Sequence, residues 1–166
     1  MFQVDEVILY GTTGVCKIQD ICEKNFGGVC TRYYILKPLL QETATVFVPT
    51  ENKKLTRKMH PLLSPEDFQD LFHTISARTP VRPESEEERQ QQFESVLQNG
   101  DRAGLMMMVH DLHNYRREQQ QVGRRLHIAD ERLLHSAENL LFEEVAFVFG
   151  MDKDCAPDFI ARQISA

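Results

Sequence analysis

The sequence contains no tryptophan, and its cysteines are few and widely spaced. None of them forms the C-x-x-C pair typical of a structural zinc site, so we expect no metal bound by thiolates. The cysteines are Cys16, Cys22, Cys30 and Cys155. The opening segment has no basic region followed by a long apolar run, and no stretch approaches the roughly 20 apolar residues of a membrane span. We therefore expect a cytoplasmic protein with free thiols and no secretory signal.

Signatures of catalysis are also missing. The chain has no G-x-S-x-G elbow and no glycine-rich phosphate loop. His110 and His113 lie one helical turn apart in "HDLH", but a helical metalloprotease motif spaces its histidines by four and adds a glutamate base. Adjacent acids such as Glu143-Glu144 point in different directions on a helix and are typical of solvated faces. We expect no enzyme, and no bound cofactor, metal or small-molecule substrate.

Negative charge is concentrated in the second part of the chain. Up to Thr79 there are 9 Lys+Arg against 9 Asp+Glu, and from Pro80 onward there are 10 against 16. Such a chain is a poor nucleic-acid binder overall, because phosphate contacts need cations. Three local basic sets remain: Lys53, Lys54, Arg57 and Lys58; Arg116 and Arg117; and Arg124, Arg125 and Arg132. Arginines near helix ends can bind DNA phosphates, but they can equally cap helices or pair with glutamates.

The first 50 residues have the pattern of short strands joined by tight turns. "VDEVILYGTTGVCKIQDI" places a β-rich run on each side of "GTTG", and Gly27-Gly28 suits the tip of a hairpin. "TATVFVP" predicts a further strand that ends at Pro49. Four or five such strands favour a small barrel or a strongly bent sheet. Its aromatic residues are expected to fill the core or a partner-facing surface, with a cage for a methylated cation as the alternative: Phe2, Tyr10, Tyr33, Tyr34 and Phe47.

From Ser64 onward the apolar residues recur at helical spacing. Ser64 is the expected N-cap of a helix over 64–77, and the prolines in "ARTPVRPESE" predict a joint at 78–85. A helical bundle is expected over 86–166, with Ser85 and Asp101 as N-caps and Gly150 ending the longest helix. The sequence therefore predicts an α+β protein, with a sheet domain over 1–63 and a helical domain over 64–166.

The order of these features resembles a known family. "MFQVDEVILYGTTGVCKIQDI", "YYILKPL" and "TVFVPTENKKL" are similar to the N-terminal part of the CarD/CdnL family of bacterial transcription regulators. "NGDRAGLMMMVHDL" and "LHIADERLLHSAENLLFEEVAFVF" are similar to its helical part. The resemblance covers nearly the whole chain in the same order, and the combination of "VFVPTEN" with "NGD", "DL" and "ADERLL" is its most persuasive feature.

This resemblance implies a Tudor-like β-barrel domain that binds the β subunit of RNA polymerase, a module shared with transcription-repair coupling factors. It also implies a compact all-α domain that contacts promoter DNA near the upstream edge of the open bubble. Family members stabilise the open promoter complex and turn over no substrate. An exposed sheet edge can pair with a partner strand, which is consistent with such docking. By position, the polymerase-binding candidates are Lys24, Arg32 and Phe47.

The helical part departs from the family pattern at its DNA-contacting end. Family members place a tryptophan wedge and an arginine pair where this chain has Glu86, and Glu88 with Arg89. A carboxylate cannot replace an indole in the minor groove. The connection "HNYRREQQQVGRRLHI" is longer than usual and offers other arginines. The DNA-binding candidates are Arg89, Arg116, Arg117, Arg124 and Arg125; the alternative is a module that docks on polymerase or another protein without DNA.

Overall fold

The computed structural model describes residues 1–82 and 85–165. Its contacts define two compact units. We call Met1–Leu62 with Gln98–Gly100 the sheet unit, and Leu63–Leu97 with Asp101–Ala166 the helical unit. Pro83 and Glu84, which belong to the predicted joint at 78–85, lie outside the described residues.

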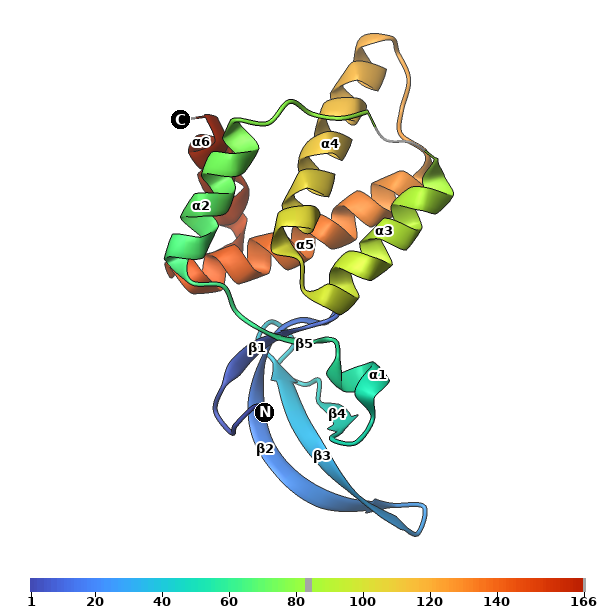
Figure 1. Cartoon of the computed structure of the whole chain (residues 1–166), viewed down its shortest axis with the longest axis vertical. Coiled ribbons are helices and arrows are strands. Elements are labelled where there is room, and N and C mark those ends of the chain that lie inside the picture. The colour runs from blue at the N-terminus through green and yellow to red at the C-terminus, as the bar shows by residue number, and fades with distance from the viewer. Residues whose placement is uncertain (83–84, 166) are drawn as a thin grey trace. The chain divides into compact units, whose positions relative to one another are not determined.

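The sheet unit contains five antiparallel strands and one short helix (Figure 1). The strands pair in the order β4-β3-β2-β1-β5, which leaves β4 and β5 at the two edges. The elements are β1 (Val7–Tyr10), β2 (Gly14–Phe26), β3 (Val29–Pro38), β4 (Val46–Pro49), α1 (Lys53–Thr56) and β5 (Met59–Pro61). Gly27 and Gly28 form the tip of the β2–β3 hairpin, and both adopt the positive φ that glycine accepts at little cost.

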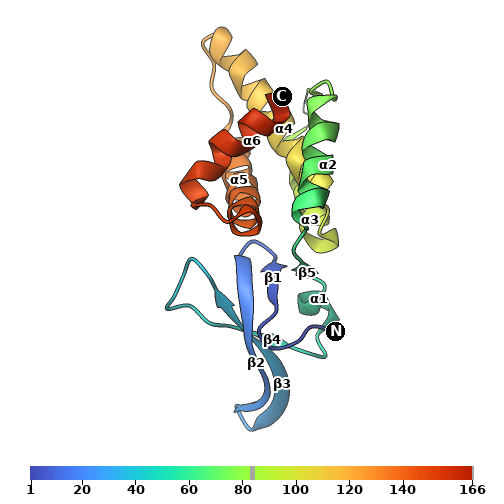
Figure 2. The ribbon, with the colours of Figure 1, turned by 90° about the vertical axis from the view of Figure 1, so that its left-hand side faces the viewer.

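The β2–β3 hairpin bends strongly along its length (Figure 2). The pairing register between its strands shifts between Ile18 and Asp20, which leaves one extra residue in β2. A bulge of this kind bends the strand and increases its local twist. The strongly bent sheet predicted from the spacing of turns is therefore confirmed.

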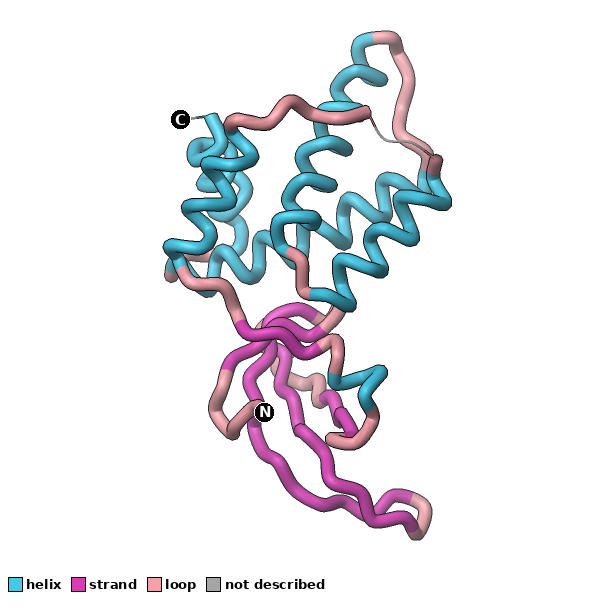
Figure 3. Tube along the Cα trace, viewed as in Figure 1, coloured by secondary structure: helices cyan, strands magenta, loops and turns pink. Residues whose placement is uncertain are grey.

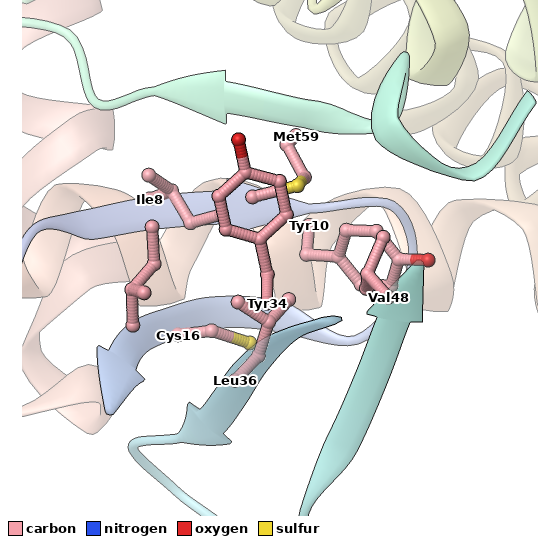
Figure 4. Close-up of a cluster of buried hydrophobic side chains, with 8 residues drawn as sticks. Ile8, Tyr10, Cys16, Tyr34, Leu36, Val48 and Met59 are labelled. Carbon is pink, nitrogen blue, oxygen red and sulfur yellow. The ribbon is translucent and has the colours of Figure 1, made fainter. Parts of the chain in front are cut away.

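The concave face of the sheet carries the core of this unit (Figure 4). Tyr10 and Tyr34 belong to it, and Phe2 packs against it, which confirms the prediction that some aromatic residues fill the core. The complete buried cluster is Ile8, Tyr10, Cys16, Ile18, Tyr34, Leu36, Val48 and Met59. Cys16 is thus a packing residue, whereas Cys30 and Cys155 are exposed.

The helical unit contains the remaining helices of the described residues, apart from the last two residues of α3, Gln98 and Asn99 (Figure 3). Their bounds are α2 (Pro65–Ser76), α3 (Glu86–Asn99), α4 (Arg102–Gln121), α5 (Ile128–Phe149), η1 (Lys153–Cys155) and α6 (Ala156–Ser165). The predicted caps are confirmed. Ser64 and Asp67 form a reciprocal capping box, and the side chains of Ser85 and Asp101 accept backbone N–H groups of α3 and α4. Gly150 ends α5 in the left-handed conformation.

The apolar stripes of these helices form the core of the helical unit. The helix pairs α2 with α6 and α4 with α5 pack against each other. An aromatic cluster joins α2 to the C-terminal part of the chain, with the rings of Phe149 and Phe159 4.9 Å apart. Within these stripes Phe68, Leu112 and Leu141 are fully enclosed, whereas Leu71 and Val148 are half-buried. No helix within the described ranges has both the length and the apolar content needed to cross a bilayer.

Glu144 is buried, contrary to the expectation that adjacent acidic residues lie on a solvated face. Its side chain is only 1% exposed, and both carboxylate oxygens accept hydrogen bonds from Nε of Arg102 at 3.1 and 3.0 Å. Burial raises the pKa of Glu144, while Arg102 and the N–H of Leu63 act in the opposite direction. The prediction of a solvated face was wrong for this residue, because its partner lies 42 positions away in the sequence.

Candidate partner-binding surfaces

The face of the β2–β3–β4 sheet opposite the core carries an exposed group of aromatic rings. Phe26 in β2, Tyr33 in β3 and Phe47 in β4 have their ring centroids 5.5–6.1 Å apart in edge-to-face arrangements. Phe26 is 52% exposed and Phe47 is 41% exposed. We call these three residues the outer aromatic cluster. The three rings are arranged edge to face as in a packed core, yet Phe26 and Phe47 are exposed and Tyr33 is half-buried.

Strand alternation explains how three strands contribute to one cluster. Side chains two residues apart share a face, and directly paired residues share it as well. Cys22 pairs with Tyr33 and Ile35 pairs with Phe47, so Phe26 falls on the same face. Tyr34 pairs with Val48 on the core face. The sequence order "YY" therefore places Tyr33 outside and Tyr34 inside.

The structure places only two of the three predicted polymerase-binding residues on this outer face. Lys24 pairs with Thr31 between Phe26 and Cys22, and its side chain is exposed beside the outer aromatic cluster. Arg32 pairs with Glu23, and strand alternation places its side chain on the face opposite to that of Tyr33. Its backbone carbonyl accepts the N–H of Thr50 after β4. Lys24 and Phe47 therefore share a surface, and Arg32 lies across the sheet from them.

Sequence reasoning missed Phe26 as a surface residue. Phe26 lies two residues after Lys24 in the strand that precedes the Gly27-Gly28 turn. Side chains two residues apart in a strand share a face, so Phe26 lies on the face of Lys24. The strand alternation before a tight turn was thus an available signal. The contact between Phe26 and Phe47 could not be predicted from this alternation, because it depends on the pairing of β3 with β4.

At the start of α3 the structure buries one DNA-binding candidate. Arg89 is 8% exposed, and its Nε and Nη2 donate to the two carboxylate oxygens of Asp130 at 2.7 and 2.6 Å. Asp130 is 1% exposed. The guanidinium of Arg89 is therefore turned into the helical unit and is not presented to DNA. Glu86–Glu88, in the first turn of the same helix, are exposed.

The other four candidate arginines lie around the end of α4 and the connection to α5. Arg117, Arg124 and Arg125 are exposed. Arg116 is half-buried, with Nη1 3.5 Å from a carboxylate oxygen of Glu131 and Nη2 3.1 Å from Nδ1 of His113. Arg116 is thus partly neutralised, and the three exposed guanidinium groups are the ones most open to an anionic partner.

Two open clefts flank this connection, and Arg125 lines both of them. The larger has a volume of about 650 Å³ and is lined by Arg116, Gln120, Arg125, Leu126, Ile128, Glu131, Arg132 and His135. The smaller has a volume of about 420 Å³ and also includes Arg124 with Tyr115. The guanidinium of Arg82 lies 5.6 Å from the centroid of the Tyr115 ring. Basic and aromatic side chains therefore gather at this end of the helical unit.

Asp111 and His113 of the "HDLH" segment form polar contacts within the helical unit. Asp111 accepts both Nη groups of Arg78 at 2.6 and 2.8 Å and the N–H of Val81 at 2.9 Å, which attaches the segment after α2 to α4. Nε2 of His113 lies 3.0 Å from a carboxylate oxygen of Glu138. Burial lowers the pKa of His110, and its Nδ1 has no hydrogen-bond partner within the described chain. Their contacts are those of structural residues.

The two units define an α+β protein in which a sheet domain precedes a helical domain. Residues 2–62 match the model of the CarD-like/TRCF RID domain, and residues 70–161 match the model of the CarD C-terminal domain. The chain therefore belongs to the CarD/CdnL family. No curated protein matches the chain.

Family membership settles the general class of activity. CarD-family proteins are transcription regulators that interact with RNA polymerase and have no enzymatic activity. The RID domain is the part that binds the polymerase β subunit. In this chain the matched RID residues are those of the sheet unit, so the outer aromatic cluster belongs to the polymerase-interacting domain.

Proposed function

We propose that this protein docks on the RNA polymerase β subunit through the outer face of its sheet and stabilises the open promoter complex. The observation that carries this proposal is the outer aromatic cluster of Phe26, Tyr33 and Phe47, with Lys24 on the same face. Exposed apolar patches mark interaction surfaces, and aromatic side chains dominate the binding energy of many interfaces. Phe47 then supplies an apolar contact to the polymerase, beside the charge of Lys24.

The position of β4 supports this mode of docking. β4 is an edge strand, and it contributes Phe47 to the outer aromatic cluster. An edge strand can add a partner strand through its main chain while alternate side chains supply specificity. The proposed contact therefore combines strand pairing along Val46–Pro49 with burial of the three rings.

The second part of the proposal concerns promoter DNA. Arg117, Arg124 and Arg125 are exposed at the connection between α4 and α5, and Arg116 lines the larger cleft beside them. Guanidinium groups position a protein on DNA through its phosphates. A regulator that binds open promoter more tightly than closed promoter shifts the equilibrium by that difference alone. It would act in the cytoplasm, on promoter-bound polymerase.

Polymerase docking is tested with matched phenylalanine variants of the full chain and the purified β lobe. Phe47→Ala is compared with Phe147→Ala, since Phe147 is 46% exposed and lies in the helical unit. We expect Phe47→Ala to weaken binding by about fivefold or more, as for an interface anchor, and Phe147→Ala to leave it unchanged. Unchanged binding of Phe47→Ala, or equal losses in both variants, would contradict the proposal.

The DNA contact is tested separately with a forked promoter in the presence of polymerase. Arg124→Ala/Arg125→Ala is compared with Lys153→Ala/Arg162→Ala, which removes the same charge from another part of the helical unit. Loss of two phosphate contacts is expected to reduce the slope of log affinity against log salt by up to about 1.8. The control pair is expected to keep the slope of the unmodified protein.

The charge of the helical unit favours a second candidate function. This unit has 11 Lys+Arg against 19 Asp+Glu, and Glu86–Glu88 are exposed at the start of α3. Both features repel phosphate. A protein that docks on polymerase without engaging DNA through this unit would bind the β lobe and show no effect of Arg124→Ala/Arg125→Ala on the salt dependence. The same two experiments therefore separate the candidates.

A further inference from the structure

The segment after β4 carries the densest group of cations in the sheet unit. Lys53, Lys54, Arg57 and Lys58 fall within six residues, over helix α1 and the residues that follow it. The first three are exposed and Lys58 is half-buried. We call these four residues the α1 basic patch. It is separate from the outer aromatic cluster and from the arginines of the helical unit.

The backbone of this patch is held in place by contacts on both sides. The side chain of Asn52 accepts the N–H of Leu55 at 3.2 Å, and Leu55 packs against the core of the sheet unit. The carbonyl of Lys58 accepts the N–H of Gly11 at 3.1 Å. Leu55 therefore packs into the core of the sheet unit, and the backbone that carries the four cations is ordered. A partner would pay little entropy to order the backbone.

The charges of the α1 basic patch are not neutralised within the described residues. None of its four side chains forms a salt bridge or hydrogen bond there. Two arginines of the helical unit behave differently, since Arg78 and Arg89 each have a carboxylate oxygen at 2.6 Å. Unpaired cations gathered on one ordered segment fit a binding surface for an anionic partner.

Charge also differs between the two units. The sheet unit has 8 Lys+Arg against 6 Asp+Glu, whereas the helical unit has 11 against 19. Long-range attraction of a polyanion is therefore expected at the sheet unit, and half of that unit's cations belong to the α1 basic patch. A contact there would offset the repulsion that the acidic helical unit exerts on phosphate.

We propose that the α1 basic patch binds the sugar-phosphate backbone of duplex DNA. Lys53 and Arg57 are four residues apart and joined by an N–H···O bond of 3.0 Å, which places them about 5–6 Å apart between Cβ atoms on one side of the turn. Cations spaced in this way can contact successive phosphates of a DNA backbone, and such contacts do not depend on the base sequence. No aromatic side chain lies among the four cations to anchor a peptide. This contact is additional to the proposed contact of Arg124 and Arg125.

The test measures binding of the full chain to a short mixed-sequence duplex, without polymerase, between about 50 and 200 mM salt. Lys53→Gln/Arg57→Gln is compared with Lys17→Gln/Lys37→Gln. Lys17 and Lys37 pair directly across β2 and β3, so the control removes the same charge from the same unit. We expect the patch variant to lower the salt slope by up to about 1.8, at about 0.9 per phosphate, and the control to leave it unchanged.

Three results would overturn the assignment. The first is that the unmodified chain binds no duplex at the lowest salt. The second is that both variants lose affinity equally, which would indicate an effect of net charge alone. The third is that the patch variant binds DNA normally but no longer binds the β lobe, which would assign the patch to an acidic protein surface. Arg124→Ala/Arg125→Ala in the same assay separates the two proposals. A reduced slope in the patch variant alone supports the α1 basic patch and shows that Arg124 and Arg125 do not contribute to binding of the free duplex.

Discussion

Replacement of Arg89 by alanine is expected to destabilise the helical unit, although the family resemblance made this arginine a DNA-binding candidate. Arg89 and Asp130 are 8% and 1% exposed and share two hydrogen bonds of 2.6 and 2.7 Å. Removal of one member of a buried pair leaves the other charge without compensation, which typically costs about 3–5 kcal/mol. Because domains are stable by only about 5–15 kcal/mol, the loss is a large fraction of the total.

The measurement is the free energy of unfolding in urea for three variants. Arg89→Ala is expected to show the full loss, or to fail to fold. Arg89→Lys keeps the charge but not the two-pronged contact, so an intermediate loss is expected. Arg89→Met/Asp130→Leu replaces the pair by apolar groups and is expected to recover most of the stability, because neither charge is then left buried alone.

The control is Arg124→Ala, which alters an exposed side chain and should change stability by no more than about 0.5 kcal/mol. DNA binding of Arg89→Met/Asp130→Leu supplies the second readout. The reasoning is refuted if Arg89→Ala is as stable as the unmodified protein, or if the double variant folds normally and loses DNA affinity. Either result would mean that the guanidinium of Arg89 is available to a partner.

Three further predictions concern single side chains. Because burial raises the pKa of Glu144 above its unfolded value of 4.5, the stability that this shift contributes is present below pH 4.5 and is lost as pH rises through the raised folded-state pKa. Glu144→Gln should remove that dependence, and parallel pH profiles of the two proteins would contradict the prediction. Because the pKa of His110 is lowered, stability should fall as pH drops below 6.5, and less so in His110→Gln, as measured by urea unfolding at a series of pH values. Ser64→Ala should cost about 1 kcal/mol through loss of the capping box, with no change in binding to the β lobe.

Many local features of this protein were predictable because their causes lie within a few residues of one another. Ser64 and Asp101 are followed by helical apolar stripes, and each caps its helix through a backbone N–H three positions away. Gly27 and Gly28 supply the positive φ of the hairpin turn. The family resemblance was likewise visible in the order of motifs, and the matches over 2–62 and 70–161 confirm it.

The short elements after β4 were harder to predict. Helix α1 has only four residues, and β5 has three. Neither contains enough residues to display a helical or strand period. β5 exists because Met59–Pro61 pairs with β1, about 50 positions earlier in the chain, and Met59 completes the core of the sheet unit. The pairing, rather than the local sequence, makes this segment a strand.

The sequence by itself determined the order of the longer strands and helices, their caps and turns, and the charge difference between the two parts of the chain. The tertiary structure decided which polar and aromatic side chains face a partner. Arg89 and Arg124 look alike in the sequence, but only Arg89 meets a buried carboxylate 41 positions away. Phe26 and Phe47 come together only because β3 pairs with both of their strands. Periods and caps are local, whereas burial and pairing depend on contacts between distant segments.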